Sequence, residues 1–378
     1  MTIVELCFSK AWGGLEMRFV EDACHLRDLG HRVIPVVCPG APAAERLVRC
    51  DFEPRTFGSL AGAFPLVSLR LARFFRRWGV EAVHIHRSRD LGPVLLAADL
   101  ANVSRRVFTL RMESHRRKFD PYHRWIYHRL TFLLTITEHL RRVVVENRPI
   151  EPHKVRCLYN GFDFTRLRAE AEPRAAIRGR WGIGAGDFVV GMVGRLDPLK
   201  GQDVLLRAAG MLADEIPALK VMIVGDETVG EPGQSDRLKR LAGELGLVGR
   251  VVFTGYQHPP GRIVPGFDVA VLATRRETFG NVAVEALALG VPVVATDAGG
   301  VTEIVDHGVD GLLVKPEDPA DLARAIEKLY RQPELRRKMG DEGARRMPER
   351  FPLERHTAGL EAALRGGSPV QTAGKNPP

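Results

Sequence analysis

Two glutamates in the second half of the sequence have the spacing to hold hydroxyl and phosphate groups at the start of a helix. Glu277 precedes and Glu285 lies within a segment, 281–289, whose apolar pattern predicts a helix. A carboxylate in a loop can bind sugar hydroxyls, and one on the helix can bind vicinal ribose hydroxyls. The backbone amides of 279–282 lie where phosphate oxygens bind a helix N-terminus. A capped amphipathic helix with an exposed glutamate explains the same spacing without any chemistry.

A second loop, 194–201, carries two cations between a predicted strand and a predicted helix. Arg195 offers a planar guanidinium and Lys200 a point charge, and together they have the charge to neutralise a diphosphate. Such charges stabilise a departing diphosphate. A basic, solvated loop is the alternative, but the position directly after a buried strand favours a functional site.

Paired glycines follow the first predicted strand. Gly13 and Gly14 end the loop 9–14 and open a helical pattern. Glycines there let backbone amides approach an anion at a helix N-terminus. A tight strand-to-helix turn explains them equally well.

Short apolar runs alternate with amphipathic segments along almost the whole sequence, which is typical of parallel sheets covered on both faces. The predicted strands of the first half are 3–8, 32–38, 82–86, 107–110, 133–137 and 155–159. Those of the second half are 189–193, 220–224, 250–254, 269–273, 293–296 and 312–314, with helices at 201–214, 235–246, 281–289 and 319–331. We therefore predict an α/β fold of two doubly wound, Rossmann-like domains whose parallel sheets face each other across a central cleft.

The predicted domains are 1–165 and 166–350, separated by a polar, Arg-rich stretch at 166–187. A last helical pattern at 353–364 comes after the second sheet is complete, so we expect it to pack back on the first domain. The tail 366–378 is rich in Gly, Pro and polar residues, which predicts disorder.

Six motifs, in order and at matching spacing, resemble those of retaining glycosyltransferases of the family-4 type. The segment from Glu277 to Glu285 resembles their E-x7-E signature, and the loop 194–201 resembles their diphosphate clamp. Similar motifs are the glycine loop at Gly13, the inter-domain link at 160–163, and the strand ends at 223–226 and 253–256. The resemblance covers residues 3 to about 364 and implies the GT-B fold, sugar transfer with retention, and no obligatory metal or other cofactor.

The resemblance also implies roles for individual residues. Arg195 and Lys200 would bind the diphosphate, Glu277 the donor sugar and Glu285 the ribose. The full predicted donor site is Gly13, Gly14, Arg195, Lys200, Glu277, Thr278, Phe279, Gly280, Asn281, Val282 and Glu285. Among these, Glu277, Arg195 and Lys200 are the predicted catalytic residues.

One position departs from the family pattern. Many members carry a His after the fourth strand of the first domain, and Arg111 stands there in this sequence. Either Arg111 replaces that His, or His86 or His115 takes over its role. The sequence leaves the general base open, with His84 expected in the core and His115 expected in solvent.

Composition narrows the class of protein and its partners. Residues 1–165 hold 26 Lys and Arg against 17 Asp and Glu, whereas the remainder holds 29 of each. This excess favours an anionic partner for the first half.

The five cysteines form no CxxC pair, and the sequence shows no DxD, HExxH or other metal-binding pattern, so no metal site is expected. No apolar run approaches the roughly 20 residues of a membrane span, and we expect a cytoplasmic protein.

Interleaved arginines and aromatic residues at 66–78 and 116–129 match either a surface helix or an anionic membrane surface. We expect peripheral association with the inner face of the cytoplasmic membrane and no nucleic-acid partner. The predicted reaction moves a sugar from a UDP- or GDP-linked donor to a glycan or lipid-linked acceptor, in lipopolysaccharide, capsule or other cell-envelope synthesis. A nucleotide-sugar epimerase of the same fold and a non-catalytic scaffold are the alternatives.

Overall fold

The computed structural model describes residues 1–58, 64–227 and 233–368. The chain forms two compact units, each built on one parallel sheet. Unit 1 comprises Met1–Gly161 and the segment that begins at Leu353; unit 2 comprises Phe162–Pro352. The boundary between Gly161 and Phe162 falls inside the predicted inter-domain link at 160–163. The last residues of the predicted disordered tail, 369–378, lie outside the described residues.

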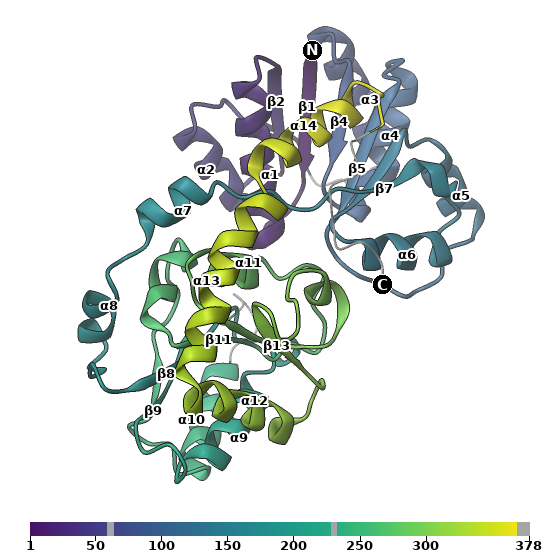
Figure 1. Ribbon diagram of the computed structural model, residues 1–378. Helices are drawn as coiled ribbons and strands as arrows, with labels where there is room; N and C mark the ends of the chain where they lie inside the picture. Colours follow the sequence, from purple (N-terminus) through teal and green to yellow (C-terminus); the bar gives the residue numbers. More distant parts are fainter. Residues whose placement is uncertain (59–63, 228–232, 369–378) are drawn as a thin grey trace. The chain divides into compact units, whose positions relative to one another are not determined.

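Unit 1 has a seven-stranded parallel sheet in the order β3-β2-β1-β4-β5-β6-β7 (Figure 1). Its strands are β1 Thr2–Cys7, β2 Arg32–Val37, β3 Arg55–Thr56, β4 Ala82–Ile85, β5 Arg105–Leu110, β6 Phe132–Thr135 and β7 Val155–Cys157. Its helices are α1 Gly14–Asp28, α2 Pro42–Arg49, α3 Phe64–Trp78, α4 Leu91–Leu100, α5 Pro121–His128, α6 Glu138–Asn147 and α14 Leu353–Leu364.

The C-terminal helix α14 completes the core of unit 1. Leu360, Ala363 and Leu364 pack with Leu158 and Ile3 in one buried cluster. Gly359 allows the close approach, because a Cβ atom there would lie 2.6 Å from the Leu158 side chain. Apolar burial and a missing side chain thus fix this helix onto a sheet formed 200 residues earlier in the chain.

Unit 2 has a six-stranded parallel sheet in the order β10-β9-β8-β11-β12-β13. Its strands are β8 Phe188–Val193, β9 Leu219–Val224, β10 Val251–Phe253, β11 Val269–Leu272, β12 Val293–Thr296 and β13 Gly311–Val314. Its helices are α7 Phe164–Glu170, α8 Arg174–Arg180, α9 Gln202–Leu212, α10 Gln234–Glu244, α11 Asn281–Ala288, α12 Pro319–Arg331 and α13 Pro333–Arg350.

The prediction of two doubly wound α/β domains is confirmed, and two details of it are wrong. Six strands were expected in the first sheet, but β3, a two-residue edge strand, makes seven. The stretch 166–187 was predicted as a polar, Arg-rich separator at the start of the second domain with no helix assigned to it, yet it contains α8 and the end of α7. Arginine-rich segments of this kind still form helices when a few apolar residues, such as Ile177, are buried.

Candidate functional site

Strand order locates the ligand-binding edge of each sheet. In open parallel sheets, ligands bind beyond the carboxyl ends of the strands, at the point where the strand order reverses. In unit 2 this switch point lies between β8 and β11, which pair directly. The loops that follow these two strands carry the two predicted charged motifs. The topology therefore brings the motifs of 194–201 and 275–285 to one place.

An ion pair joins the two loops. Nζ of Lys200 lies 2.8 Å from Oε2 of Glu277, although the two residues are 77 positions apart in the sequence. Their side chains are 31% and 17% exposed, so the pair is accessible to a ligand without being fully solvated. A cation and a carboxylate in contact offer one group for phosphate oxygens and one for hydroxyl groups.

Arg275 holds the same two loops together and was given no role by the sequence. Its backbone NH donates to the Leu199 carbonyl at 2.9 Å. Its guanidinium donates to Asp203 at 3.1 and 3.2 Å and to Glu317 at 2.7 Å. These contacts make Arg275 a scaffold for the site, because its donors are occupied by protein acceptors.

Two glycines allow the loops to approach. Gly201 has φ +77°, and a Cβ atom there would lie 2.0 Å from the Ala273 carbonyl oxygen. Gly299, in the loop after β12, has φ +64°, and its Cβ atom would lie 2.2 Å from the Glu277 carbonyl oxygen. The NH of the next residue, Gly300, donates to that same carbonyl at 2.8 Å. Only glycine is compatible with both the left-handed backbone and the close contact.

The loop after β12 thus contacts the Glu277 backbone and is a third loop of the candidate site, beside those after β8 and β11. The sequence analysis did not identify it. The signal was present, since Gly299 and Gly300 follow the end of the predicted strand 293–296 after two intervening residues. Paired glycines at the carboxyl end of a buried strand have the same meaning here as at Gly13 and Gly14.

The other predicted donor residues of unit 2 differ in their exposure and backbone conformation. Arg195 is exposed, 56% at its side chain, and 3.7 Å from Asp197. Gly280 has φ +100° and caps α11, which begins at Asn281 with Val282 as its second residue, as predicted; Thr278 and Glu285 are half-buried. The Phe279 side chain is buried between the rings of Phe162 and Phe351, so only its backbone is available to a ligand.

In unit 1 the strand order reverses between β1 and β4. The loop after β1 ends at Gly13, the N-cap of α1, and Gly14 is the first helical residue. Gly13 has an extended backbone, and a Cβ atom there would only touch Glu16 at 3.6 Å. Neither the backbone conformation nor a steric contact therefore requires glycine at Gly13. Close approach of a ligand to the backbone is the remaining explanation for the missing side chain.

Arg111 lies at the end of β5 and is buried in an ion-pair network, not exposed to solvent. Its guanidinium donates to Asp22 of α1 at 2.7 Å and to Asn160 at 2.8 Å. His356 of α14 contacts the second Asp22 oxygen at 3.0 Å. Burial opposes ionisation of Asp22, but Arg111 and His356 outweigh it and hold its pKa well below the ordinary value.

As expected, His84 is buried and His115 is exposed, and His86, for which the sequence gave no expectation of burial, is buried too. His84 is fully buried and His86 is 1% exposed, both in contact with Glu5 of β1. His115 is 57% exposed and contacts Glu113 at 2.5 Å. Burial and the neighbouring charge of His84 lower the pKa of His86 to about 4, so this imidazole is neutral at pH 7.

Comparison with known proteins matches most of the chain. Residues 12–166 match the model of Glycosyltransferase Family 4, and residues 173–346 match that of Glycosyl transferases group 1. A D-inositol 3-phosphate glycosyltransferase of Nocardia farcinica is 39% identical over 204 residues, which are 53% of this chain and 45% of that protein. The chain spans about half the length of such relatives.

Solved structures share the whole fold. Anabaena HepE, crystallised with UDP, superposes with a TM-score of 0.85 at 24% identity, covering 97% of this chain and 100% of the other. A glycosyltransferase from Rickettsia africae superposes with a TM-score of 0.88 at 20% identity, covering 97% and 98%. These likenesses show the two-domain GT-B architecture of Rossmann-like domains.

Proposed function

We propose, because the chain belongs to the glycosyltransferases of group 1 and family 4, that it transfers a sugar with retention from a nucleoside diphosphate sugar bound to unit 2. The contact between Lys200 and Glu277 carries this proposal. It joins a phosphate-binding cation to a hydroxyl-binding carboxylate at the switch point of a parallel sheet. HepE, with the same fold, was crystallised with UDP and with UDP-glucose.

In the proposed reaction, the bond between the anomeric carbon and the diphosphate oxygen breaks. Lys200 and Arg195 stabilise the negative charge that develops on the leaving diphosphate. Glu277 holds the donor sugar through its hydroxyl groups, and Glu285 binds the ribose. The acceptor oxygen forms its bond to the anomeric carbon on the face from which the diphosphate leaves, and the departing phosphate oxygen accepts the proton of that hydroxyl. This front-face route is proposed over a covalent intermediate, because the sequence shows no well-placed carboxylate nucleophile.

A panel of nucleotide sugars tests the donor. The panel is UDP-glucose, UDP-N-acetylglucosamine and GDP-mannose. At least one of them is expected to raise the melting temperature of the protein, because a ligand that binds the folded state stabilises it by mass action. The Glu277→Gln variant is expected to lose about 100- to 1,000-fold in kcat with that donor. Unchanged turnover by Glu277→Gln would remove this residue from the proposed site.

Two alternative functions predict different products. A nucleotide-sugar epimerase would isomerise the donor without an acceptor, which chromatography detects. A non-catalytic binding or scaffold protein would release no nucleoside diphosphate from any pair of donor and acceptor. Activity in excess EDTA tests whether the reaction depends on a divalent metal.

We propose a phosphate-bearing acceptor, because residues 1–165 have nine more basic than acidic residues, 26 against 17. The D-inositol 3-phosphate named for the relatives is the first acceptor to test, against unphosphorylated inositol as control. A phosphorylated, lipid-linked glycan of the cell envelope is the second, with the release of UDP or GDP as the measurement. Equal turnover of inositol and its phosphate would refute the charge argument.

Peripheral membrane association is proposed for the outer face of α3. Leu66 and Leu69 are exposed, 65% and 44%, and the neighbouring Arg70, Arg73 and Arg77 are exposed as well. Among the described residues, no helix is both long and apolar enough to span a bilayer. Each arginine near an anionic bilayer contributes about 1 kcal/mol. Flotation with anionic liposomes at low salt is expected for the wild type and not for Arg70→Gln/Arg73→Gln.

A further inference from the structure

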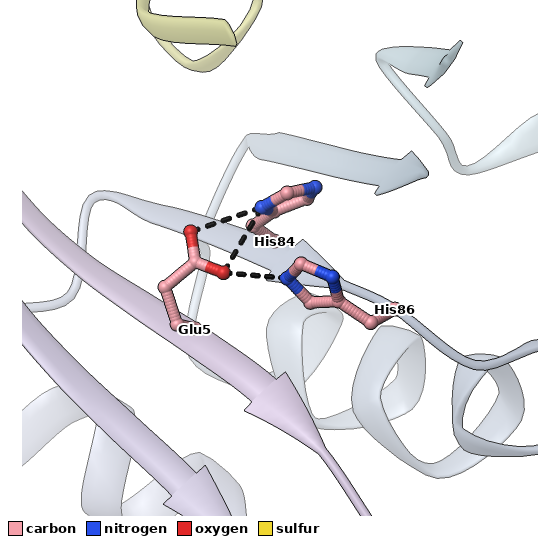
Figure 2. A group of neighbouring side chains, drawn as sticks. All are labelled: Glu5, His84 and His86. Atoms are coloured by element: carbon pink, nitrogen blue, oxygen red, sulfur yellow. Dashed lines mark hydrogen bonds and ion pairs between the residues drawn. The ribbon is translucent and has the colours of Figure 1, made fainter. Parts of the chain in front are cut away.

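The switch point of unit 1 contains a buried cluster of one carboxylate and two imidazoles. Glu5 of β1 faces two adjacent imidazoles, that of His84 in β4 and that of His86 directly after this strand, and contacts both (Figure 2). The exposed fractions of the three side chains are 0%, 0% and 1%, respectively. Apolar residues in place of a buried ion pair are often as stable or more stable, so stability alone is a weak reason for a charge in this place. The cluster therefore calls for a functional explanation.

The hydrogen bonds to Glu5 determine which ring nitrogens of His84 and His86 carry protons. Burial would raise the pKa of Glu5, but His84 and His86 outweigh it, and the pKa lies below its ordinary value. The ionised carboxylate only accepts, so Nδ1 of His84 donates to it at 2.9 Å and Nε2 of His86 at 2.6 Å. A neutral His86 that donates through Nε2 must carry a lone pair on Nδ1.

Within the described parts of the chain, Nδ1 of His86 is a buried nitrogen of the cluster for which the protein provides no hydrogen-bond donor. Nε2 of His84 contacts the hydroxyl of Thr109 at 2.7 Å, whereas Nδ1 of His86 has no partner among the residues that the structure describes. Figure 2 shows this nitrogen on the side of the ring away from Glu5. Buried polar atoms are nearly always hydrogen-bonded, so an unused acceptor at a ligand-binding edge indicates a donor supplied by a ligand.

A divalent cation is the competing occupant, because the three ligand atoms of the cluster lie within 4.8 Å of one another. Two observations oppose it. The hydrogen bonds to Glu5 already use those atoms, and the positive charge of Arg111 acts on His86 and disfavours a second cation there.

We propose that Glu5 is a positioning residue: by accepting the Nε2 proton of His86, it fixes the imidazole in the tautomer whose Nδ1 accepts a hydrogen bond from a hydroxyl group of a polyol bound to unit 1. This inference rests on the proposed transferase function only for the identity of the ligand. The tautomer itself is a property of the free protein. Glu5 touches no substrate and acts through His86.

Nitrogen-15 NMR of histidine-labelled protein tests the tautomer without any ligand. His84→Asn and His86→Asn assign the two resonances. We expect Nδ1 of His86 to be unprotonated and Nε2 to be protonated in the wild type, and this pattern to change in Glu5→Gln. A His86 protonated at Nδ1, or a stoichiometric shift of both histidines by Zn²⁺, overturns the proposal.

Kinetics test the consequence. Glu5→Gln is expected to lower kcat/KM for inositol 3-phosphate by about 10- to 100-fold, as for other partners that orient an imidazole. In a His86→Ala background the same change is expected to have less than about a 2-fold effect, because the two residues act as a unit. Additive losses would show a purely structural role. Thr109→Val is the matched control, since it removes a partner of His84 without contacting His86, and its kcat/KM should be unchanged.

Donor binding separates this inference from the proposed function. Glu5→Gln should keep the full thermal stabilisation by the nucleotide sugar, because that ligand binds unit 2. If the wild type binds no donor, the transferase proposal fails while the NMR result still decides the tautomer.

Discussion

The two switch points occupy equivalent places in two similar sheets and are built in opposite ways. In unit 2 the charged groups stand on loops, and Lys200 and Glu277 are partly exposed. In unit 1 Glu5 lies on β1, Asp22 on α1 and Arg111 directly after β5, and all three are buried in ion pairs. A site built on loops can be recognised from short sequence motifs. A network that joins β1 and α1 to α14 cannot, because its residues lie far apart in the sequence. The difference also predicts that unit 1 loses stability when it is altered, and unit 2 loses ligand binding.

The largest expected effect is on stability in unit 1. Asp22→Asn leaves the buried Arg111 guanidinium without its counter-charge and removes the charge that His356 contacts, which should cost about 3–5 kcal/mol of unfolding free energy. Denaturant unfolding followed by tryptophan fluorescence reports on this unit, because Trp12, Trp78 and Trp125 lie in it.

Asp28→Asn on the same helix is the control. Asp28 is 63% exposed, and its one ion pair with a described residue is with its neighbour Arg27, so its loss should change stability by less than about 0.5 kcal/mol. Equal effects of the two variants would show that the buried network does not distinguish the two units.

Gly299→Ala is the corresponding test in unit 2. The new methyl group would collide with the backbone carbonyl of Glu277 and shift this residue. A displacement of the Glu277 side-chain carboxylate by about 1 Å should lower kcat/KM for the donor about 100-fold. Gly290→Ala is the control, because it shares the left-handed backbone, φ +77°, but has no atom within 4 Å of the added Cβ. A similar kinetic loss in both variants would assign the effect to backbone strain.

Lys200→Met should mainly weaken donor binding. Hydrogen bonds to charged groups contribute about 1.5–3 kcal/mol, so the Kd of the nucleoside diphosphate should rise about 10- to 100-fold. The melting temperature of the free protein should change little. Calorimetric titration with UDP and with GDP measures it. Binding of wild-type strength would mean that Lys200 serves only to hold Glu277.

The sequence predicts the fold well because apolar strands and amphipathic helices have distinct periods. It missed β3, because two residues have no period, and it could not give Arg275 a role, because a scaffold arginine differs from a phosphate-binding one only in its partners. At Arg111 the sequence showed a departure from the family pattern. The structure supplies the physical content, since the guanidinium faces Asp22 and Asn160. The donor roles of Arg195, Glu277 and Glu285 remain predictions.

The smallest expected effect contrasts the buried acids of the two units across pH. Asp310 of unit 2 is fully buried, and its partner Arg346 lies 3.2 Å away but is shared with Asp306 at 2.5 Å. Burial therefore dominates and raises the pKa of Asp310 to about 6, whereas that of Asp22 is lowered. The stability contributed by a neutral Asp310 is complete below its ordinary pKa of 3.8 and is lost as the pH rises to about 6.

For Asp22 the sign is the reverse: its contribution is present above 3.8 and is lost as the pH falls. Asp310→Asn should therefore become more stable relative to the wild type as the pH rises from 4 to 7. The full shift corresponds to about 3 kcal/mol, but the variant also loses its ion pair with Arg346, so a net gain of about 1 kcal/mol is expected at the upper end. Asp22→Asn should be most destabilised over the same range and approach the wild type only in acid. Denaturant midpoints of both variants at pH 4, 5, 6 and 7 measure the two slopes. Parallel slopes would mean that the two arginines neutralise their partners equally, and that the contrast between the two units does not extend to their buried charges.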